Sequence, residues 1–373
     1  MKNQIEKEMG SIEKREVKIP TKEEDDQACI HAMVLSSFQV FPSVLNAAID
    51  LNLFEIISES APLGEYVSVS DIASKIPTQH HELDKRVDRM LRVLATFSLL
   101  NSTTNTNKDG MVERFYSLSL TGKYFLRNQT ENLASFTNLT SHPSQVKVWL
   151  NMKDAILDGG IDLFKKVHGI TMWENMEKDT KLNHTFNKAM TGMSAVQMRK
   201  YLEVYDGFQG ISTLVDVGGG TGQCLKMILS KYPNIKGINF DLPQVIQHAL
   251  PYPGIEHVGG NMHESVPSGD AIMIKATCHN WSDETCITIL KKCYKALPEN
   301  GKVIILDMIM PEEIDSSDAT KYVSIIDNTM FILAGGKERT EKEFEKLCEE
   351  SGFSRSVVVC LALSVFGVIE FYK

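Results

Sequence analysis

Four closely spaced glycines constrain the fold of this chain more than any other feature. Residues 214–222 read Leu-Val-Asp-Val-Gly-Gly-Gly-Thr-Gly, with glycines 218, 220 and 222 at alternate positions after Asp216. Glycine lets a backbone turn sharply and approach a ligand where a Cβ atom would collide. The next segment, 223–231, has helix-forming composition, so its free N–H groups are expected to face the same ligand. The pattern predicts a strand, a ligand-binding loop and a helix, in that order.

An acid after the next apolar segment indicates the kind of ligand. A second strand is predicted at 235–240 and ends at Asp241, 19 residues after Gly222. In nucleotide-binding folds a carboxylate at this separation from the glycine loop accepts hydrogen bonds from ribose hydroxyls. The ligand is therefore predicted to contain a nucleoside.

The two phosphate-binding loops of known spacing fit poorly. A dinucleotide loop needs a third glycine where Leu225 stands, and a P-loop needs Gly-Lys-Ser/Thr where Gln223 and Cys224 follow Gly222. The absence of Lys and Arg between Val215 and Leu225 disfavours a pyrophosphate and suits a ligand that carries a sulfonium cation. The loop resembles the S-adenosylmethionine loop of methyltransferases. A NAD-type loop and a tight turn without a ligand remain the alternatives at this point.

Composition limits the other possibilities. A chain of 373 residues with 43% hydrophobic residues predicts two domains with sizeable cores. The net charge of -9 argues against nucleic acid or an anionic membrane as a partner. Seven scattered cysteines without a Cys-x-x-Cys pair are typical of reduced thiols. No signal peptide and no 18-residue apolar window is found, so a cytoplasmic location is expected.

The first part of the chain has a helical pattern. Residues 28–51 are apolar at helical spacing, with an expected break at Phe41-Pro42. Short helices at 72–75 and 86–99, followed by a hairpin at 114–120, are typical of a winged helix. Because the segment 81–88 is charge-balanced rather than basic, we expect this domain to support dimerisation rather than to bind DNA.

The second part alternates strands and helices. Strands are predicted from residue 212 and at 236–240, 271–276, 302–308 and 356–369. This order is typical of a Rossmann-like, doubly wound parallel α/β sheet, whose ligand lies at the carboxyl ends of the strands. The expected domains are a disordered lead (1–25), a winged-helix-like dimerisation domain (26–130), a helical linker that contributes to the acceptor pocket (131–210) and a cofactor-binding domain (211–373).

Three ionisable residues are expected at the same edge of that sheet. His279 follows the strand 271–276, ahead of a helix capped by Ser282; Asp307 ends the next strand, and Glu338 follows two glycines. Either carboxylate could fix the imidazole tautomer and direct the free ring nitrogen toward an acceptor hydroxyl. The alternatives are a structural histidine, a strand-end cap at Asp307 and a surface position for Glu338.

Longer segments resemble a known family. Residues 214–222, 237–243, 256–260 and 278–283 are similar to motifs of the plant small-molecule O-methyltransferases of the caffeic acid type, and the resemblance runs from about Asp26 to Lys373. Within that family, residues 45–56 and 336–341 are most similar to the chalcone O-methyltransferases. The resemblance implies S-adenosylmethionine-dependent methylation of a phenolic hydroxyl in flavonoid or phenylpropanoid biosynthesis. It favours the 2'-hydroxyl of a chalcone such as isoliquiritigenin, with caffeic acid, flavonoid and isoflavonoid hydroxyls, or a cofactor-binding protein that has lost catalysis, as alternatives.

The resemblance also implies roles for individual residues. His279 would be the general base, bracketed by Asp307 and Glu338. The residues implied in cofactor binding are Gly218 at the methionine end, Asp241 at the ribose, Asn261 and Met262 at the adenine, and Lys275 and Ser194 at polar groups nearby. The residues implied in acceptor binding are Phe186, Met190, Asn280 and Met330; without the family, the apolar members of this set would be read as core.

The implied reaction yields S-adenosylhomocysteine and involves no metal. The implied assembly is a homodimer in which Ala32, Met33 and their neighbours complete the partner's pocket, with no nucleic acid or membrane partner.

Two positions depart from the family pattern. Asn261 replaces the usual aspartate, and a neutral acceptor gives the weaker hydrogen bond, so a modest loss of cofactor affinity is expected. Asp307 replaces the usual glutamate and is one methylene shorter. If it does not reach His279, Glu338 alone orients the imidazole or a water bridges the gap.

Overall fold

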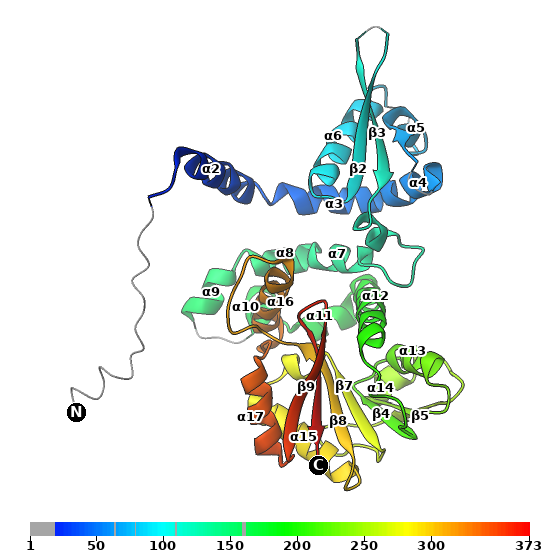
Figure 1. The fold of residues 1–373 in the computed structure, drawn as a ribbon, viewed down its shortest axis with the longest axis vertical. Coiled ribbons are helices and arrows are strands. Elements are labelled where there is room, and N and C mark those ends of the chain that lie inside the picture. The colour runs from blue at the N-terminus through cyan, green and yellow to red at the C-terminus, as the bar shows by residue number, and fades with distance from the viewer. Residues whose placement is uncertain (1–18, 63–64, 79, 109, 159–161) are drawn as a thin grey trace, which may run out of the picture.

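The computed structural model describes residues 19–62, 65–78, 80–108, 110–158 and 162–373 (Figure 1). A helical domain with a small sheet lies at one end of the molecule, and a seven-stranded sheet flanked by helices lies at the other. A layer of helices separates the two (Figure 1).

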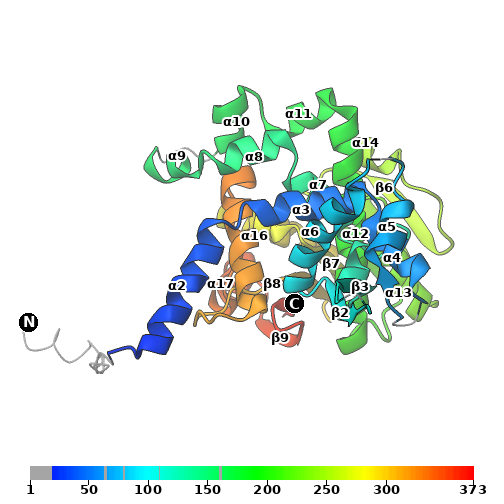
Figure 2. The same cartoon turned by 90° about the horizontal axis from the view of Figure 1, so that it is seen from above.

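The described chain begins with two helices. α2 (Lys22–Ser36) starts at a capping box formed by Thr21 and Glu24, and α3 (Val40–Asp50) follows after a short break. The break between the two helices lies before Phe41-Pro42, the position at which the sequence predicted it. Pro42 instead falls in the first turn of α3, where the N–H that proline lacks would have no partner within the helix. The lead expected to be disordered through residue 25 is thus helical from Lys22, and residues 1–18 lie outside the described part. Helix α2 has no buried residue and extends away from the rest of the chain (Figures 1 and 2).

The N-terminal domain has the winged-helix pattern. It contains α4 (Leu53–Ser60), β1 (Val67–Ser68), α5 (Val69–Ser74), α6 (Leu83–Thr96), β2 (Leu100–Thr106) and β3 (Val112–Leu118). The sheet order is β1-β3-β2, antiparallel throughout. The hairpin forms at 100–118 rather than at 114–120. The sequence pattern missed β2 because its residues after Leu100 are polar and exposed, without apolar alternation.

Helices form the layer between the two sheets (Figure 1). These elements are η2 (Gly122–Phe125), α7 (Ala134–Thr140), α8 (Pro143–Trp149), α9 (Met152–Leu157), α10 (Leu163–His168), α11 (Met172–Lys178) and α12 (Thr180–Val204). Helix α12 makes extensive contacts with α7 and also contacts α13 (Gln223–Lys231), so it links the layer to the large sheet.

The large sheet contains β4 (Thr213–Val217), β5 (Lys236–Asp241), β6 (Ile255–Gly259), β7 (Ala271–Lys275), β8 (Lys302–Met308), β9 (Arg355–Ala362) and β10 (Phe366–Tyr372). Its order is β6-β5-β4-β7-β8-β10-β9. The connecting elements are α13, α14 (Pro243–Ile246), η3 (Cys278–Asn280), α15 (Asp283–Ala296), α16 (Asp318–Ala334) and α17 (Glu341–Ser351).

Two features of this sheet correct the sequence prediction. The sheet is mixed rather than fully parallel, because β10 runs antiparallel to both β8 and β9. The single strand expected at 356–369 is two strands joined at Leu363 and Ser364, both with positive φ. The apolar composition continues across this turn and hides it from a pattern analysis. The Rossmann-like doubly wound arrangement is confirmed for β4 to β8.

Packing on both faces fixes the sheet and leaves one edge for ligands. One core cluster places Leu225 and Tyr201 on one face, and a second places Ile289 and Phe344 on the other. The carboxyl ends of the parallel strands point toward the helical layer (Figure 1). Among the described residues, no single helix is long and apolar enough to cross a membrane; the bent pair α2 and α3 passes only a joint test of length and composition.

Candidate active site

The glycine loop after β4 needs its glycines for two different reasons. Gly218, Gly220 and Gly222 have φ values of +73°, +60° and +86°, which side-chain-bearing residues rarely adopt. At Gly220 an added Cβ would meet nothing within 4 Å, so backbone conformation rather than crowding requires glycine there. At Gly219 a Cβ would lie 2.2 Å from Asn239 Oδ1 and 2.7 Å from an oxygen of the Asp216 carboxylate. Glycine is therefore also required at position 219, which is not one of the alternating glycines noted in the sequence.

Asp241 lies directly against this loop. Its Oδ2 accepts a hydrogen bond from the Gly220 N–H at 2.8 Å, and its Oδ1 accepts from the Leu242 N–H at 2.7 Å. Asn239 donates to the Gly220 carbonyl oxygen at 2.9 Å. The carboxylate predicted to bind ribose thus also holds the loop in its shape.

Asp216 is a second carboxylate at this edge, and the sequence analysis gave it no role. It is 1% exposed, and neither of its oxygens has a hydrogen-bond partner among the described residues. Burial raises its pKa to about 7, an effect that the charge of Lys275 opposes and that of Asp241 increases. Two carboxyl groups beside the loop disfavour a pyrophosphate as its ligand.

Asn261 and Met262 follow β6, the strand that lies next to β5 in the sheet. The Asn261 Oδ1 accepts from the His263 N–H at 3.0 Å, and its Nδ2 donates to Glu264 at 3.2 Å. One lone pair of this amide oxygen remains for an adenine amino group. Met262 packs against the core of the sheet.

A cavity of about 300 Å³ lies between the helical layer and the edge of the sheet. Most of its wall is apolar. Seven residues singled out from the sequence line it, namely Phe186, Met190, Ser194, Lys275, His279, Asn280 and Met330. The wall does not include Gly218, Asp241, Asn261 or Met262. The predicted cofactor loop therefore lies outside the predicted acceptor pocket.

Lys275 connects the sheet to α12 at the wall of this cavity. Its Nζ donates to Gln197 Oε1 at 2.8 Å and lies 3.2 Å from Ser194 Oγ. Gln197 carried no signal in the sequence, because an amide in the middle of a long helix has no distinctive neighbours.

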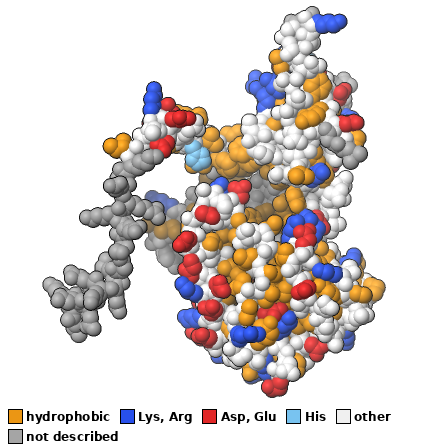
Figure 3. All heavy atoms as spheres, in the orientation of Figure 1, with side chains coloured by type: hydrophobic (Ala, Val, Ile, Leu, Met, Phe, Trp, Pro, Cys, Tyr) orange, Lys and Arg blue, Asp and Glu red, His pale blue; other side chains and the backbone are white. Residues whose placement is uncertain are grey.

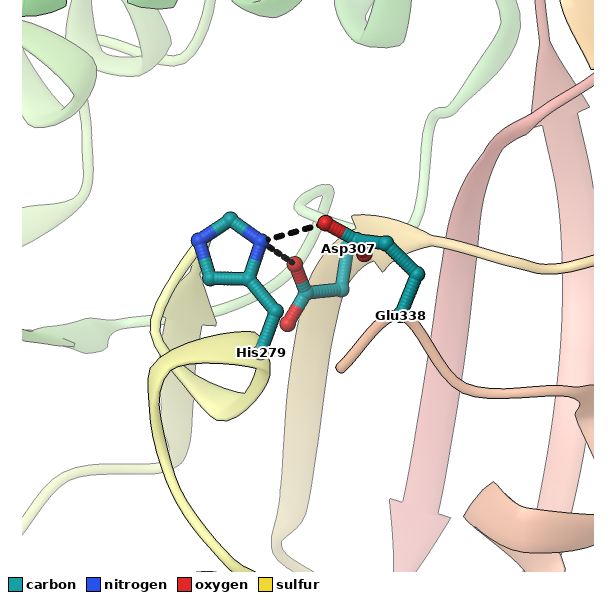
Figure 4. A group of neighbouring side chains, drawn as sticks. All are labelled: His279, Asp307 and Glu338. Carbon is teal, nitrogen blue, oxygen red and sulfur yellow. Dashed lines mark hydrogen bonds and ion pairs between the residues drawn. The ribbon is translucent and has the colours of Figure 1, made fainter. Parts of the chain in front are cut away.

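Among the described residues, His279 has a partner at one ring nitrogen and none at the other. Its Nδ1–H donates to Glu338 Oε1 at 2.8 Å, while Asp307 Oδ1 lies 3.7 Å from the same nitrogen (Figure 4). The Asp307 distance is too long for a hydrogen bond, so Glu338 fixes the tautomer. Nε2 points away from both carboxylates (Figure 4), and in the neutral ring it carries the lone pair when Nδ1 carries the hydrogen. Because His279 lines the cavity, this arrangement has the geometry of a general base.

The surroundings of His279 stabilise its charged form. Burial lowers the pKa of His279, but the charge of Asp307 and the hydrogen bond and charge of Glu338 outweigh it, and the net pKa lies above the ordinary 6.5. Burial raises the pKa of Asp307 and Glu338 themselves, against the lowering effect of the imidazole. The imidazolium that forms when His279 accepts a proton is therefore stabilised.

The backbone around His279 is held by the loop that carries Glu338. The buried guanidinium of Arg339 donates to the carbonyl oxygens of Cys278 at 2.7 Å and Trp281 at 2.8 Å. The Lys337 N–H donates to the His279 carbonyl oxygen at 3.0 Å, and a Cβ at Gly336 would lie 1.8 Å from that oxygen. Gly336 and Arg339 thus position His279, and the sequence gave no sign of either contact.

The three ionisable side chains also have the composition of a metal site. One ligand atom each from His279, Asp307 and Glu338 lies within 4.8 Å of the others. The hydrogen bond from Nδ1 to Glu338 occupies the nitrogen that would face an ion, so the observed arrangement favours a proton-accepting histidine.

Activity is expected to fall at low pH through the titration of His279. Only the neutral imidazole can accept a proton, and the pKa of His279 is raised, so kcat/KM should decline tenfold per pH unit below a midpoint above 6.5. Glu338→Gln keeps an acceptor for Nδ1–H but removes the charge, so the midpoint should move to lower pH. Glu343→Gln, which changes an acid that pairs with Lys337 on the same segment, should leave it in place. A midpoint unchanged by Glu338→Gln would contradict this assignment.

Comparison with known proteins identifies the family. Residues 149–354 match the O-methyltransferase domain, and residues 33–128 match the O-methyltransferase dimerisation domain. The chain is 48% identical to the caffeic acid 3-O-methyltransferase of Catharanthus roseus over 98% of its length and 100% of that protein. It is 47% identical to the esculetin O-methyltransferase of Kitagawia praeruptora over 95% of its length and 97% of that protein.

A solved structure shows the same fold. The crystal structure of human N-acetylserotonin methyltransferase in complex with SAM has a TM-score of 0.78 and 20% sequence identity, covering 95% of this chain and 99% of that one. With the family domains and the two plant relatives, this agrees with the methyltransferase fold and the N-terminal dimerisation domain described above. The chain belongs to the caffeic acid-type family of plant O-methyltransferases, which are S-adenosylmethionine-dependent enzymes.

Proposed function

We propose that the protein methylates a phenolic hydroxyl of a phenylpropanoid or flavonoid, and that its acceptor is the 2'-hydroxyl of a chalcone such as isoliquiritigenin. The observation that carries the proposal is the free Nε2 of His279 at an apolar cavity with Phe186, Met190 and Met330 in its wall. Such a wall suits a flat aromatic ring. The names of the plant relatives support a phenolic acceptor and favour caffeic acid, at its 3-hydroxyl, as the second candidate.

The chemistry needs a base and an aligned acceptor. S-adenosylmethionine, when bound, would supply a methyl group from its sulfonium, and its sulfur would keep the electron pair of the broken sulfur–methyl bond and leave as S-adenosylhomocysteine. His279 Nε2 takes the phenolic proton, so the O–H bond breaks and its electron pair stays on the oxygen that bonds to the methyl carbon. Glu338 holds the resulting imidazolium at Nδ1. Base catalysis contributes about 10²- to 10⁴-fold, and alignment of oxygen, methyl and sulfur can contribute more.

The residues present fit the cofactor. The glycine loop has the backbone shape of a nucleoside-binding turn, and Asp241 stands beside it at the end of β5. Asp216 adds a buried carboxylate beneath the loop, without a hydrogen-bond partner among the described residues. In this proposal Asp241, Asn261 and Met262 bind the nucleoside part, Gly218 faces the methionine end, and Lys275 and Ser194 bind polar groups nearby.

The acceptor pocket is completed in a homodimer in this proposal. The chain carries the family's dimerisation domain at residues 33–128. Hydrophobic side chains, including Met33 and Phe38, are exposed along α2 and the start of α3 (Figure 3). Exposed apolar surface of this kind marks a protein–protein contact. The partner's copy of Ala32 and Met33 would close the back of the pocket.

Turnover on a small acceptor panel tests the proposal. Purified protein with S-adenosylmethionine is assayed against isoliquiritigenin, caffeic acid, a flavonol and an isoflavone, and the methylated position is identified by mass spectrometry and NMR. A 2'-methoxychalcone is expected as the dominant product, at equal rates with and without EDTA because no metal takes part. A methylated caffeic acid as the dominant product would keep the mechanism and overturn the acceptor. Cofactor binding without any product would indicate lost catalysis, and loss of activity in EDTA would show that the reaction needs a metal ion.

A further inference from the structure

Gln145 is a buried amide at the wall of the acceptor cavity, and its side-chain oxygen lacks a partner among the residues that the structure describes. It lies on α8, is 3% exposed and lines the cavity. Its Oε1 is enclosed and makes no hydrogen bond to any described residue. Buried amides nearly always have a hydrogen-bond partner, and leaving one unpaired costs free energy.

The other amide and hydroxyl side chains in the cavity wall differ from Gln145, because each has a partner within the described part of the protein. Thr140 donates to the Thr137 carbonyl oxygen, Asn280 to that of Ala276 and Thr329 to that of Ile325. Tyr322 donates to the sulfur of Met193, while Ser194 and Gln197 bind Lys275. Among the amide and hydroxyl side chains of the wall, Gln145 is therefore the one whose oxygen is buried without a hydrogen-bond partner in the described part of the protein.

The position of Gln145 indicates which part of an acceptor it meets. α8 belongs to the helical layer, whereas His279 lies on η3, which follows β7 at the edge of the large sheet (Figure 1). A ring whose hydroxyl faces His279 presents its other side to the helical layer. An amide can both donate and accept, so it can bind a second hydroxyl or a carbonyl oxygen there.

We infer that Gln145 is a specificity-determining residue that hydrogen-bonds a second oxygen of the acceptor, remote from the hydroxyl that is methylated. The inference rests on the proposed methylation of a phenol and narrows its substrates to polyoxygenated phenols. A phenol without the second oxygen leaves the Gln145 amide unpaired in an apolar wall and is discriminated against.

A double-variant cycle, in which the protein and the acceptor are changed separately and then together, tests this role. Gln145→Leu and the unchanged protein are compared on the best acceptor of the panel and on analogues that each lack one non-reacting oxygen. One analogue is expected to lose about tenfold in kcat/KM with the unchanged protein and to lose nothing with Gln145→Leu. Equal losses for every analogue in both proteins would overturn the inference.

Asn138→Leu is the matched control. Asn138 lies on the neighbouring α7, and its amide oxygen is likewise buried without a described partner, but it is not part of the cavity wall. This variant should leave the discrimination between analogues unchanged, and a change as large as that of Gln145→Leu would overturn the inference. Calorimetric binding of the same analogues to protein loaded with S-adenosylhomocysteine reads the contact without turnover. If no phenol is methylated, the proposed function fails, while analogue-dependent binding that Gln145→Leu abolishes still supports the role of Gln145.

Discussion

His279→Ala is expected to lower kcat by about 10²- to 10⁴-fold and to leave the Kd of S-adenosylmethionine within about twofold. The reason is geometric: Nε2 of His279 is the free base at the acceptor cavity, while Asp241 and the glycine loop lie outside the wall of that cavity. Single-turnover rates at pH 7.5 and calorimetric titration with the cofactor measure the two quantities.

The variant needs a check on folding, because it leaves two buried carboxylates facing each other. Asp307 and Glu338 are 3% and 4% exposed, and loss of the imidazole removes a partner of both. His279→Gln retains polar atoms at the position and should show the same loss of turnover with a smaller change in Tm. His248→Ala, at an exposed histidine, should behave like the unchanged protein. Full turnover of His279→Ala at pH 7.5 would falsify the assignment of the base.

Asp241→Ala is expected to weaken the binding of S-adenosylmethionine by about 10- to 100-fold, since hydrogen bonds to charged groups contribute roughly 1.5–3 kcal/mol each. The carboxylate is predicted to bind ribose, and it also accepts the Gly220 N–H that shapes the loop. Equilibrium titration with the cofactor measures the loss, and kcat at saturating cofactor should change much less.

Asp270→Ala separates this effect from general destabilisation. Asp270 also accepts two backbone N–H groups, from Ser212 at 3.1 Å and Thr213 at 2.8 Å, but it does so at the opposite end of β4. This variant should lower Tm and leave cofactor affinity unchanged. An unaltered Kd in Asp241→Ala, or an equal loss in Asp270→Ala, would count against the ribose assignment.

Much of the fold follows from local patterns. The helix at 223–231 and the strand at 302–308 lie where the sequence predicted them, because an apolar strand ahead of glycines and a strand with a continuous apolar centre are strong signals. The polar wing strand β2 and the turn between β9 and β10 were missed. In both cases tertiary pairing, rather than composition, determines the structure.

The candidate site was likewise predicted only in part from the sequence. His279, Asp307 and Glu338 were expected together, because strand ends and a glycine turn bring them to one edge. Which carboxylate holds the imidazole depends on one methylene and a distance of 3.7 rather than 2.8 Å, which no sequence pattern contains. Arg339 acts through hydrogen bonds to a segment distant in the chain, and Gln145 lines a cavity whose wall comes from distant segments, so neither position could be recognised from the sequence.

The account depends most on where an acceptor hydroxyl lies relative to His279. A crystal structure of the homodimer with S-adenosylhomocysteine and the best acceptor of the panel measures this directly. We predict the cofactor at the glycine loop with its ribose on Asp241, and the reacting oxygen about 2.6–3.2 Å from His279 Nε2. A cofactor bound elsewhere, or an acceptor whose reactive hydroxyl lies beyond reach of His279, would contradict the account.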